Sequence, residues 1–234
     1  MIKKLVLVFV TFITIQSYAQ QGTASPYSFY GIGSLKFKGT VENRSMGRLS
    51  IYTDSIHINL RNPASYASEN LASPRFNGES RPVKYTVGGG FSNLNLKSET
   101  SSAKASSATF NYLALSIPVG RFGVGFSILP QTAVGYKLEN LNDDGDLINQ
   151  YKGEGGLNKV NLGIGYLLAK GLSIGVDANY NFGNIQNNIV EYSYDADGLI
   201  LQYQSKEGNR SDLSGINFNL GLSYKTKINT NLEL

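Results

Sequence analysis

The stretch "GLSIGVDANYNFG", residues 171–183, alternates apolar and polar side chains over its whole length. One face holds the apolar residues, from Leu172 and Ile174 to Phe182, and the opposite face holds only Ser, Gly, Asp and Asn. A period of two predicts a β-strand that separates an apolar environment from a polar one.

The same alternation recurs in residues 158–168 and 214–224. The polar faces are mostly Asn, Ser and Gly with few long charged side chains, which suits the crowded, hydrated interior of a barrel. Large aromatic residues of the apolar faces fall towards strand ends, as a membrane girdle requires: Phe122, Tyr136, Tyr180 and Tyr224. We therefore predict an all-β fold, a transmembrane antiparallel β-barrel. A secreted β-sandwich is the alternative, because its strands alternate as well.

The N-terminal residues predict export to the cell envelope. Two lysines, Lys3 and Lys4, precede an apolar run from Leu5 to Ile15, and the small-residue ending at Ala19 resembles a cleavage site. The apolar run is too short to span a bilayer as a helix. Residues 1–19 are therefore predicted to be a signal peptide, and the outer membrane is the expected destination.

The composition narrows the class of protein. The chain has 26 Gly, 15 Tyr, 11 Phe and no Cys, which excludes a disulfide framework. No later apolar run is long enough for a membrane helix. Because 21 basic residues face 17 acidic ones, the charge balance does not indicate nucleic acid as a partner.

The spacing of the strands predicts a barrel that this chain covers only in part. The predicted strands are residues 83–97, 107–119, 121–138, 157–168, 171–193 and 209–225, with a seventh opening near Ile228. Short links, "VGRF" and "LAKGL", alternate with longer polar links around "NDDGDL" and "DADGLI", as periplasmic turns alternate with extracellular loops. An open edge in hydrocarbon leaves backbone groups unpaired, so we expect an N-terminal fragment of the barrel, spanning 83–234. A barrel shared between identical chains is the alternative.

Residues 20–82 precede the first strand and are rich in Gly, Ser and Asn, without long periodicity. Such a segment can fold into the barrel interior from the periplasmic side. We therefore predict an N-terminal hatch, or plug.

Four stretches carry a resemblance to a known family: "SPYSFYGIG", "NRSMGRLSIYTDSIHINLRNPASYAS", "NYLALSIPV" and "ILPQTAVGY". Together they resemble the Bacteroidetes branch of the FadL/TodX-like outer-membrane transport proteins. The resemblance implies a fourteen-stranded barrel, a hatch motif at Asn62, Pro63 and Ala64, and passive transport of long-chain fatty acids or hydrocarbons. Some relatives of this fold, the PorV-like proteins, act instead as carriers in protein secretion, and this is the alternative function. A secretion carrier needs extracellular loops that bind its partner. The predicted loops are polar and lack an exposed apolar run, which favours transport.

Pro130 lies inside a predicted strand, in "GFSILPQTAVGYKL", residues 125–138. Because proline has no backbone N–H, Pro130 is expected to interrupt strand pairing on one side. The resemblance implies that a kink here, at Pro130 and Gln131, opens a lateral gate. It also makes Leu113 and Leu115 of the neighbouring strand a candidate ligand path. A bulge that only tunes twist, and ordinary burial against the hatch, are the alternatives.

Three cations, Arg48, Arg61 and Lys137, are candidate partners for a ligand carboxylate, because a charge in a dry lumen needs a partner. Pairing with wall acids such as Asp177 is the alternative. The single histidine, His57, lies within four residues of Asp54 and Ser55, too close along an extended chain to form a catalytic triad.

No catalytic residue, metal site or cofactor is predicted, and the protein is not expected to be an enzyme. The expected partners are a hydrophobic small molecule and the lipid of the outer membrane. A secreted protein domain takes their place in the alternative function.

Overall fold

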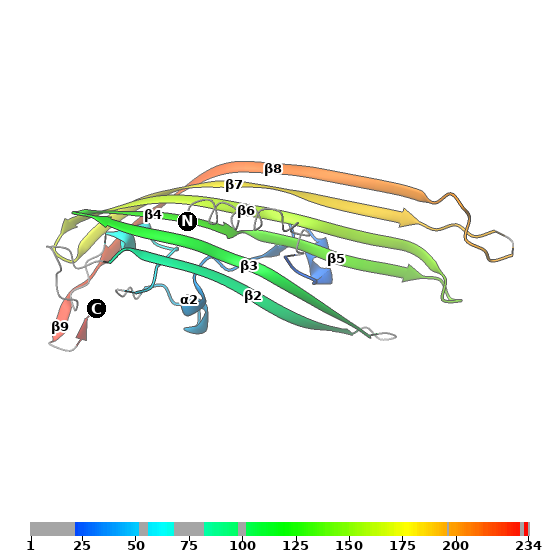
Figure 1. The fold of residues 1–234 in the computed structure, drawn as a ribbon, viewed down its shortest axis with the longest axis horizontal. Coiled ribbons are helices and arrows are strands. Elements are labelled where there is room, and N and C mark those ends of the chain that lie inside the picture. The colour runs from blue at the N-terminus through cyan, green and yellow to red at the C-terminus, as the bar shows by residue number, and fades with distance from the viewer. Residues whose placement is uncertain are drawn as a thin grey trace, which may run out of the picture.

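The structure is a computed structural model that describes residues 22–51, 56–67, 82–97, 102–195, 197–229 and 232–233. Its main feature is one eight-stranded antiparallel sheet that curls into a half-barrel (Figure 1). The elements in chain order are η1 (Pro26–Phe29), β1 (Ser34–Leu35), α2 (Val41–Ser45), η2 (Pro63–Tyr66), β2 (Lys84–Lys97), β3 (Ser102–Val119), β4 (Phe122–Pro130), β5 (Thr132–Leu141), β6 (Leu147–Ala169), β7 (Leu172–Glu191), β8 (Ser205–Tyr224), β9 (Lys227–Asn229) and β10 (Leu232–Glu233). The all-β prediction is confirmed. The predicted signal peptide lies outside the described residues.

The alternation in residues 171–183 becomes strand β7, as predicted. Ser173, Asp177 and Asn179 are buried, whereas Ile174 and Val176 are exposed on the opposite face. We call the face that carries Ser173 and Asp177 the inner face of the sheet, and the opposite one the outer face. Within the described part of the chain, no helix is both long and apolar enough to cross a bilayer.

Several strands are longer than predicted, and one is divided. β3, β6 and β8 begin at Ser102, Leu147 and Ser205, upstream of the predicted starts. The sequence "LINQYKGEGG" at the start of β6 has no regular alternation of apolar and polar residues, yet its backbone pairs with β5 and β7. The predicted third strand is divided between β4 and β5.

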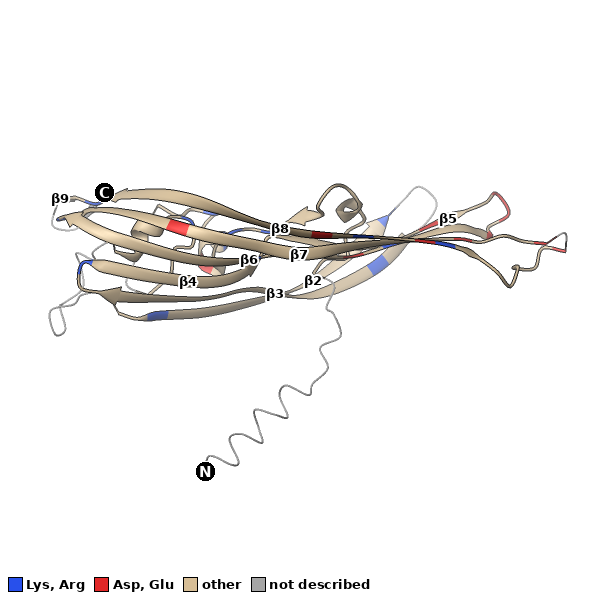
Figure 2. Cartoon of the chain, turned by 90° about the horizontal axis from the view of Figure 1, so that it is seen from above, with Lys and Arg blue, Asp and Glu red and all other residues tan. Residues whose placement is uncertain are grey.

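The N-terminal segment, residues 22–51 and 56–67, packs against the inner face. η1 lies on β5, and η2 contacts β4, β6, β7 and β8. Figure 2 shows this segment enclosed on one side by the curled sheet. Ile58, Leu60 and Tyr66 of the segment form a hydrophobic cluster with the β3 and β4 side chains Tyr112, Ala114 and Leu129.

Candidate functional site

Four glycines form a continuous row across the inner face of the sheet. Gly123 of β4 pairs with Gly165 of β6, Gly165 with Gly175 of β7, and Gly175 with Gly221 of β8. A Cβ atom at any of these positions would clash with residues of the N-terminal segment between Asn62 and Ala67. The row is therefore a socket that lets the backbone of η2 lie directly on the sheet.

Hydrogen bonds fix the η2 turn in this socket. Asn62 caps η2 through its Oδ1, which accepts from the Ala64 N–H at 3.0 Å, and its Nδ2 donates to the Leu222 carbonyl at 2.9 Å. Ser173 Oγ donates to the Ala64 carbonyl at 3.0 Å. The predicted motif Asn62, Pro63 and Ala64 thus joins the N-terminal segment to β7 and β8.

The Tyr66 side chain extends from η2 over a second pair of glycines next to the socket, Gly125 of β4 and Gly163 of β6. A Cβ atom at either glycine would clash with the Tyr66 ring. Tyr66 is 5% exposed. Burial raises the pKa of the Tyr66 phenol well above its ordinary value, and the negative charge of Asp177 acts in the same direction. The neutral phenol is therefore the form that this packing favours.

A buried polar cluster lies next to the socket. Asp177 of β7 is 1% exposed, and its Oδ1 accepts hydrogen bonds from Asn179 Nδ2 at 2.5 Å and from Asn219 Nδ2 at 2.7 Å. Lys38 of the N-terminal segment places its Nζ 4.0 Å from Asp177 Oδ2. The carboxylate thus joins the inner wall to the segment through Lys38, which is not one of the three cations predicted from the sequence.

The sheet splits at Pro130. β3 pairs with β4 from Val119↔Phe122 to Leu113↔Ile128, and no residue of β5 pairs with β3. β4 and β5 both continue to pair with β6 on their other edge. In Figure 1 the β2–β3 hairpin diverges from β5 beyond this point. Proline lacks the N–H that continued pairing requires, so its position is consistent with the end of the β3–β4 ladder.

Strand β1 pairs with the edge of β5 that faces away from β6 and that β3 does not reach. Ser34 pairs with Ala133, Leu35 pairs with Thr132, and the Lys36 N–H donates to the Gln131 carbonyl at 2.9 Å. The N–H of Gln131 donates to the Leu157 carbonyl of β6 at 2.7 Å. The N-terminal segment therefore closes part of the split by adding a short strand.

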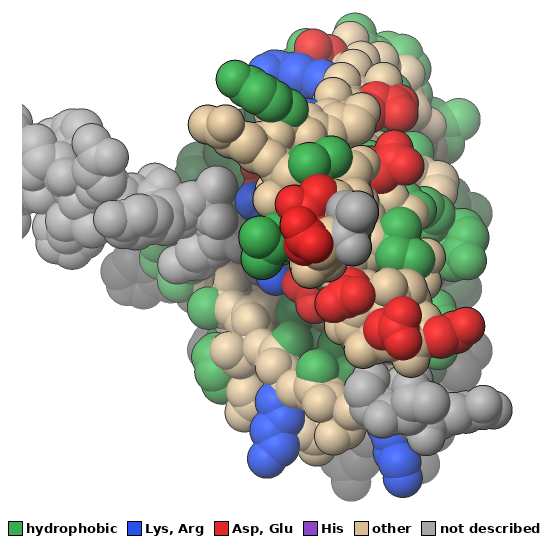
Figure 3. Space-filling model, turned by 90° about the vertical axis from the view of Figure 1, so that its right-hand side faces the viewer, with side chains coloured by type: hydrophobic (Ala, Val, Ile, Leu, Met, Phe, Trp, Pro, Cys, Tyr) green, Lys and Arg blue, Asp and Glu red, His purple; other side chains and the backbone are tan. Residues whose placement is uncertain are grey.

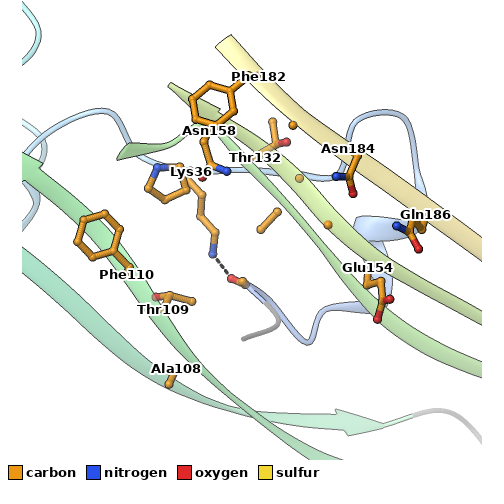
Figure 4. Close-up of a pocket in the computed structure, with 16 residues that line it drawn as sticks. Lys36, Ala108, Thr109, Phe110, Thr132, Glu154, Asn158, Phe182, Asn184 and Gln186 are labelled. Carbon is orange, nitrogen blue, oxygen red and sulfur yellow. Dashed lines mark hydrogen bonds between the residues drawn. The ribbon is translucent and has the colours of Figure 1, made fainter. Parts of the chain in front are cut away.

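A cavity of about 490 Å³ opens at the split (Figure 4). Phe110 of β3, Pro130 of β4 and Phe182 of β7 contribute apolar surface, while Glu154 contributes a carboxylate. Lys36 lines the cavity and its Nζ donates to the Gly22 carbonyl at 2.6 Å. Burial, and then the charge of Arg44, lower the pKa of Lys36.

Of the residues predicted for a gate, Pro130 lines the cavity and Gln131 joins β4 to β5. Leu113 and Leu115 pair with Ile128 and Phe126 on the outer face, so they do not line the inner side of the sheet. A β-bulge between Gly88 and Gly89 also turns Phe110 to the face opposite Tyr112. The buried apolar residues near the split are covered by the N-terminal segment.

The three predicted cations do not converge on one site. The Arg48 guanidinium lies 5.5 Å from the centre of the Phe37 ring, and Arg61 Nη1 donates to the Arg48 carbonyl at 3.1 Å. Lys137 is exposed and pairs with Glu139 at 2.8 Å. The His57 carbonyl accepts a hydrogen bond from Lys84 Nζ at 3.0 Å, while Asp54 and Ser55 lie outside the described residues.

The outermost loop differs from the expectation of a wholly polar loop. Leu199, Ile200, Leu201 and Tyr203 between β7 and β8 are exposed to solvent, Tyr203 to 87%. Acidic side chains gather at the same end of the molecule (Figure 3). Sequence reasoning missed this apolar tip because "DADGLILQY" reads first as a turn.

The curled antiparallel sheet and the segment seated in it define a β-barrel protein. Over residues 1–234 the chain matches the family model BamG, and it belongs to the BamG family. The family and the fold are consistent with the outer membrane. No curated protein and no solved structure matches the chain.

The resemblance to the FadL/TodX-like transport proteins is therefore wrong as an assignment of family. BamG is a different family, and its model matches the chain over its whole length. The residues that suggested the resemblance have a local structural explanation, because Asn62-Pro63-Ala64 occupies the glycine socket and Pro130 ends a ladder.

Proposed function

We propose that the protein is an outer-membrane barrel with an N-terminal hatch, and that a hydrophobic small molecule passes through its wall at the split between β3 and β5. The observation that carries this proposal is the loss of β3 pairing after Leu113↔Ile128, with a cavity at the same place. Movement through such an opening is passive and requires no catalytic group.

An apolar outer face supports the membrane placement. Phe218 and Leu220 of β8 are 70% and 86% exposed, and the apolar row of β7 runs from Leu172 to Phe182. Continuous exposed apolar surface of this kind suits lipid. The split begins at the end of this apolar surface. Pro130 of β4 pairs with Asn158 of β6, and Asn158 pairs with Phe182, the last residue of the apolar row of β7.

Closure of the barrel needs more strands than the described residues provide. Within those residues, β2 and β8 each pair on one edge only. Unpaired edges in hydrocarbon cost several kcal/mol per backbone group. We propose that additional strands, from this polypeptide or from another copy, join β8 to β2. The fourteen-stranded size was implied only by the FadL/TodX resemblance, which the family match overturns.

The N-terminal segment supplies the closing element of the proposed opening. β1 contributes two residues to the sheet, Ser34 and Leu35, so its pairing with β5 involves few hydrogen bonds. Each contributes about 0.5–1.5 kcal/mol to stability. The η2 turn is held by the socket, so β1 is the part of the segment that can leave the sheet at low cost.

Uptake by whole cells tests this function. Cells that lack the gene, complemented or not with the wild-type gene, are mixed with the apolar fluorophore N-phenylnaphthylamine, and its rate of entry is measured. Ala108→Trp places a bulky side chain at the cavity, and Ala103→Trp is the matched control on the same strand, outside the cavity. We expect complementation to raise the rate, Ala108→Trp to remove most of the gain, and Ala103→Trp to keep it. Equal rates in all four strains would contradict the proposal.

A second candidate is a carrier that binds a secreted protein domain. The observation that favours it is the exposed apolar tip of the β7–β8 loop, from Leu199 to Tyr203, at the far end of these two strands (Figure 1). Exposed apolar patches of this kind frequently mark protein contacts. In this function the split can stay closed.

A further inference from the structure

Lys159 is a largely buried cation without a direct partner among the residues that the structure describes. It lies on the inner face of β6, is 9% exposed, and forms no hydrogen bond or ion pair with any residue that the structure describes. Its strand neighbours are Leu129 of β4 and Asn181 of β7. The carboxylate of Asp177 attracts this ammonium through space, but buried charges are normally paired directly.

A second ammonium, that of Lys38, reaches the same region from the N-terminal segment. Its nearest acid is Asp177, at 4.0 Å, the long limit of an ion pair. Burial lowers the pKa of Lys38, the charge of Asp177 opposes this, and the charge of Arg61 adds to it. Lys38 and Lys159 also repel each other electrostatically.

One carboxylate, that of Asp177, therefore serves two ammonium groups, that of the buried Lys159 and that of the partly exposed Lys38. Asp177 already accepts two amide hydrogen bonds on Oδ1, from Asn179 and Asn219. The protein groups that surround the two ammonium groups thus leave positive charge and ammonium N–H donors unused.

We propose that Lys38 and Lys159 form an anion-binding site between the N-terminal segment and the inner wall, which takes a carboxylate or phosphate group. The site lies directly behind the split, because Lys159 follows Asn158 of the cavity lining and faces Leu129, the residue before Pro130. It is separate from the three cations predicted from the sequence. The site goes beyond the proposed passage and does not depend on it.

Binding to the purified protein in a neutral detergent tests the site. Isothermal titration is carried out with four probes: inorganic phosphate, acetate, dodecyl phosphate and dodecanoate. We expect at least one probe to bind, and Lys159→Met to weaken it by roughly tenfold or more, since a hydrogen bond to a charged group contributes about 1.5–3 kcal/mol. Lys159→Arg should retain binding. Asp177→Asn should tighten it, because the competing negative charge is removed while an acceptor oxygen remains for Asn179 and Asn219.

Lys137→Met, at an exposed cation paired with Glu139, is the control and should bind as the wild type does. Folding of Lys159→Met is checked by thermal unfolding without ligand, where removal of an unpaired buried charge should not lower the melting temperature. Binding of inorganic phosphate or acetate as tight as that of the dodecyl compounds would identify a free anion. Binding of the dodecyl compounds alone would identify the head group of an amphiphile.

Absence of binding by every probe, or equal affinity of the wild type and Lys159→Met, would overturn the site. Because no transport is measured in this experiment, failure of the anion site leaves the proposed passage intact. Loss of the passage in cells likewise leaves the binding result intact.

Discussion

Ser34 of the N-terminal segment is the antiparallel partner of Ala133 on β5, at the edge of β5 that β3 leaves unpaired. The same strand, β5, thus receives a two-residue strand from a region about a hundred positions earlier in the chain. A sheet edge is energetically costly when exposed, and coverage by another segment is a common solution. The split in the wall and its cover are therefore parts of one arrangement.

The glycine socket predicts that Gly→Ala substitutions at different positions of one strand change the stability of the protein by very different amounts. Gly221→Ala would place a methyl group against Asn62 and Pro63, whereas a Cβ at Gly215, also in β8, meets nothing within 4 Å. Overpacking of this kind costs about 1–3 kcal/mol. We expect Gly221→Ala to lower the free energy of unfolding in detergent by that amount, measured with urea. Gly175→Ala should act similarly and Gly215→Ala should stay near the wild type; equal stability of all three variants would contradict the socket.

The buried phenol of Tyr66 predicts a loss of stability in alkali. Because the folded pKa is raised above the ordinary value of 10.0, the unfolded chain releases this proton first as the pH rises. The stability that depends on the neutral phenol is present below pH 10 and is lost as the pH rises towards the folded pKa. Tyr66→Phe should therefore lose less unfolding free energy than the wild type between about pH 9 and pH 12.

Alkaline unfolding curves of the two proteins measure this difference. Tyr85→Phe, at an exposed position of β2, is the control and should follow the wild-type curve. Parallel curves for the wild type and Tyr66→Phe would show that Tyr66 does not carry the pH dependence.

The sequence predicted the strands where an apolar and a polar environment meet. β7 and the later part of β6 alternate because one face is buried against the N-terminal segment and the other is apolar and exposed. The alternation failed for residues 147–156, where the apolar residues Leu147, Ile148 and Tyr151 do not keep to one face. It also misplaced Tyr136, which was expected in an outer girdle but is 5% exposed and packs against Phe29 at 5.2 Å between ring centroids.

The site was only partly predictable, because most of it depends on register between strands. Pro130 indicated an interruption, since proline lacks a donor. Nothing in the two residues of β1 indicates that they pair with β5. The glycine row requires four strands to align, and the approach of Lys38 to Asp177 joins residues far apart in the chain.

The apolar tip of the β7–β8 loop separates the two candidate functions. Leu199→Ser combined with Tyr203→Ser replaces exposed apolar side chains, so the fold should be unchanged. If the protein is a passage for small molecules, fluorophore entry into cells should equal that of the wild type. If it is a carrier, the variant should lose a secreted protein that copurifies with the wild type and with Ala108→Trp. Loss of fluorophore entry in the loop variant would contradict the first function.

The most direct test of the passage is a disulfide that holds β1 on β5. The chain has no cysteine, so Ser34→Cys with Ala133→Cys introduces a single possible bridge. Antiparallel partners have Cα atoms about 4.5–5.5 Å apart, within the range of disulfides. The control pair is Ser92→Cys with Ser107→Cys, at neighbours on β2 and β3 whose Oγ atoms are 2.9 Å apart.

The measurement is the rate of N-phenylnaphthylamine entry into cells that make each oxidised protein, before and after addition of a reductant. If molecules pass through the split, the bridge between positions 34 and 133 should abolish the protein-dependent rate of entry, and the reductant should restore it. The control bridge should have no effect on the rate. An undiminished rate with the oxidised Ser34–Ala133 bridge would show that β1 does not close the path, and would contradict the central claim.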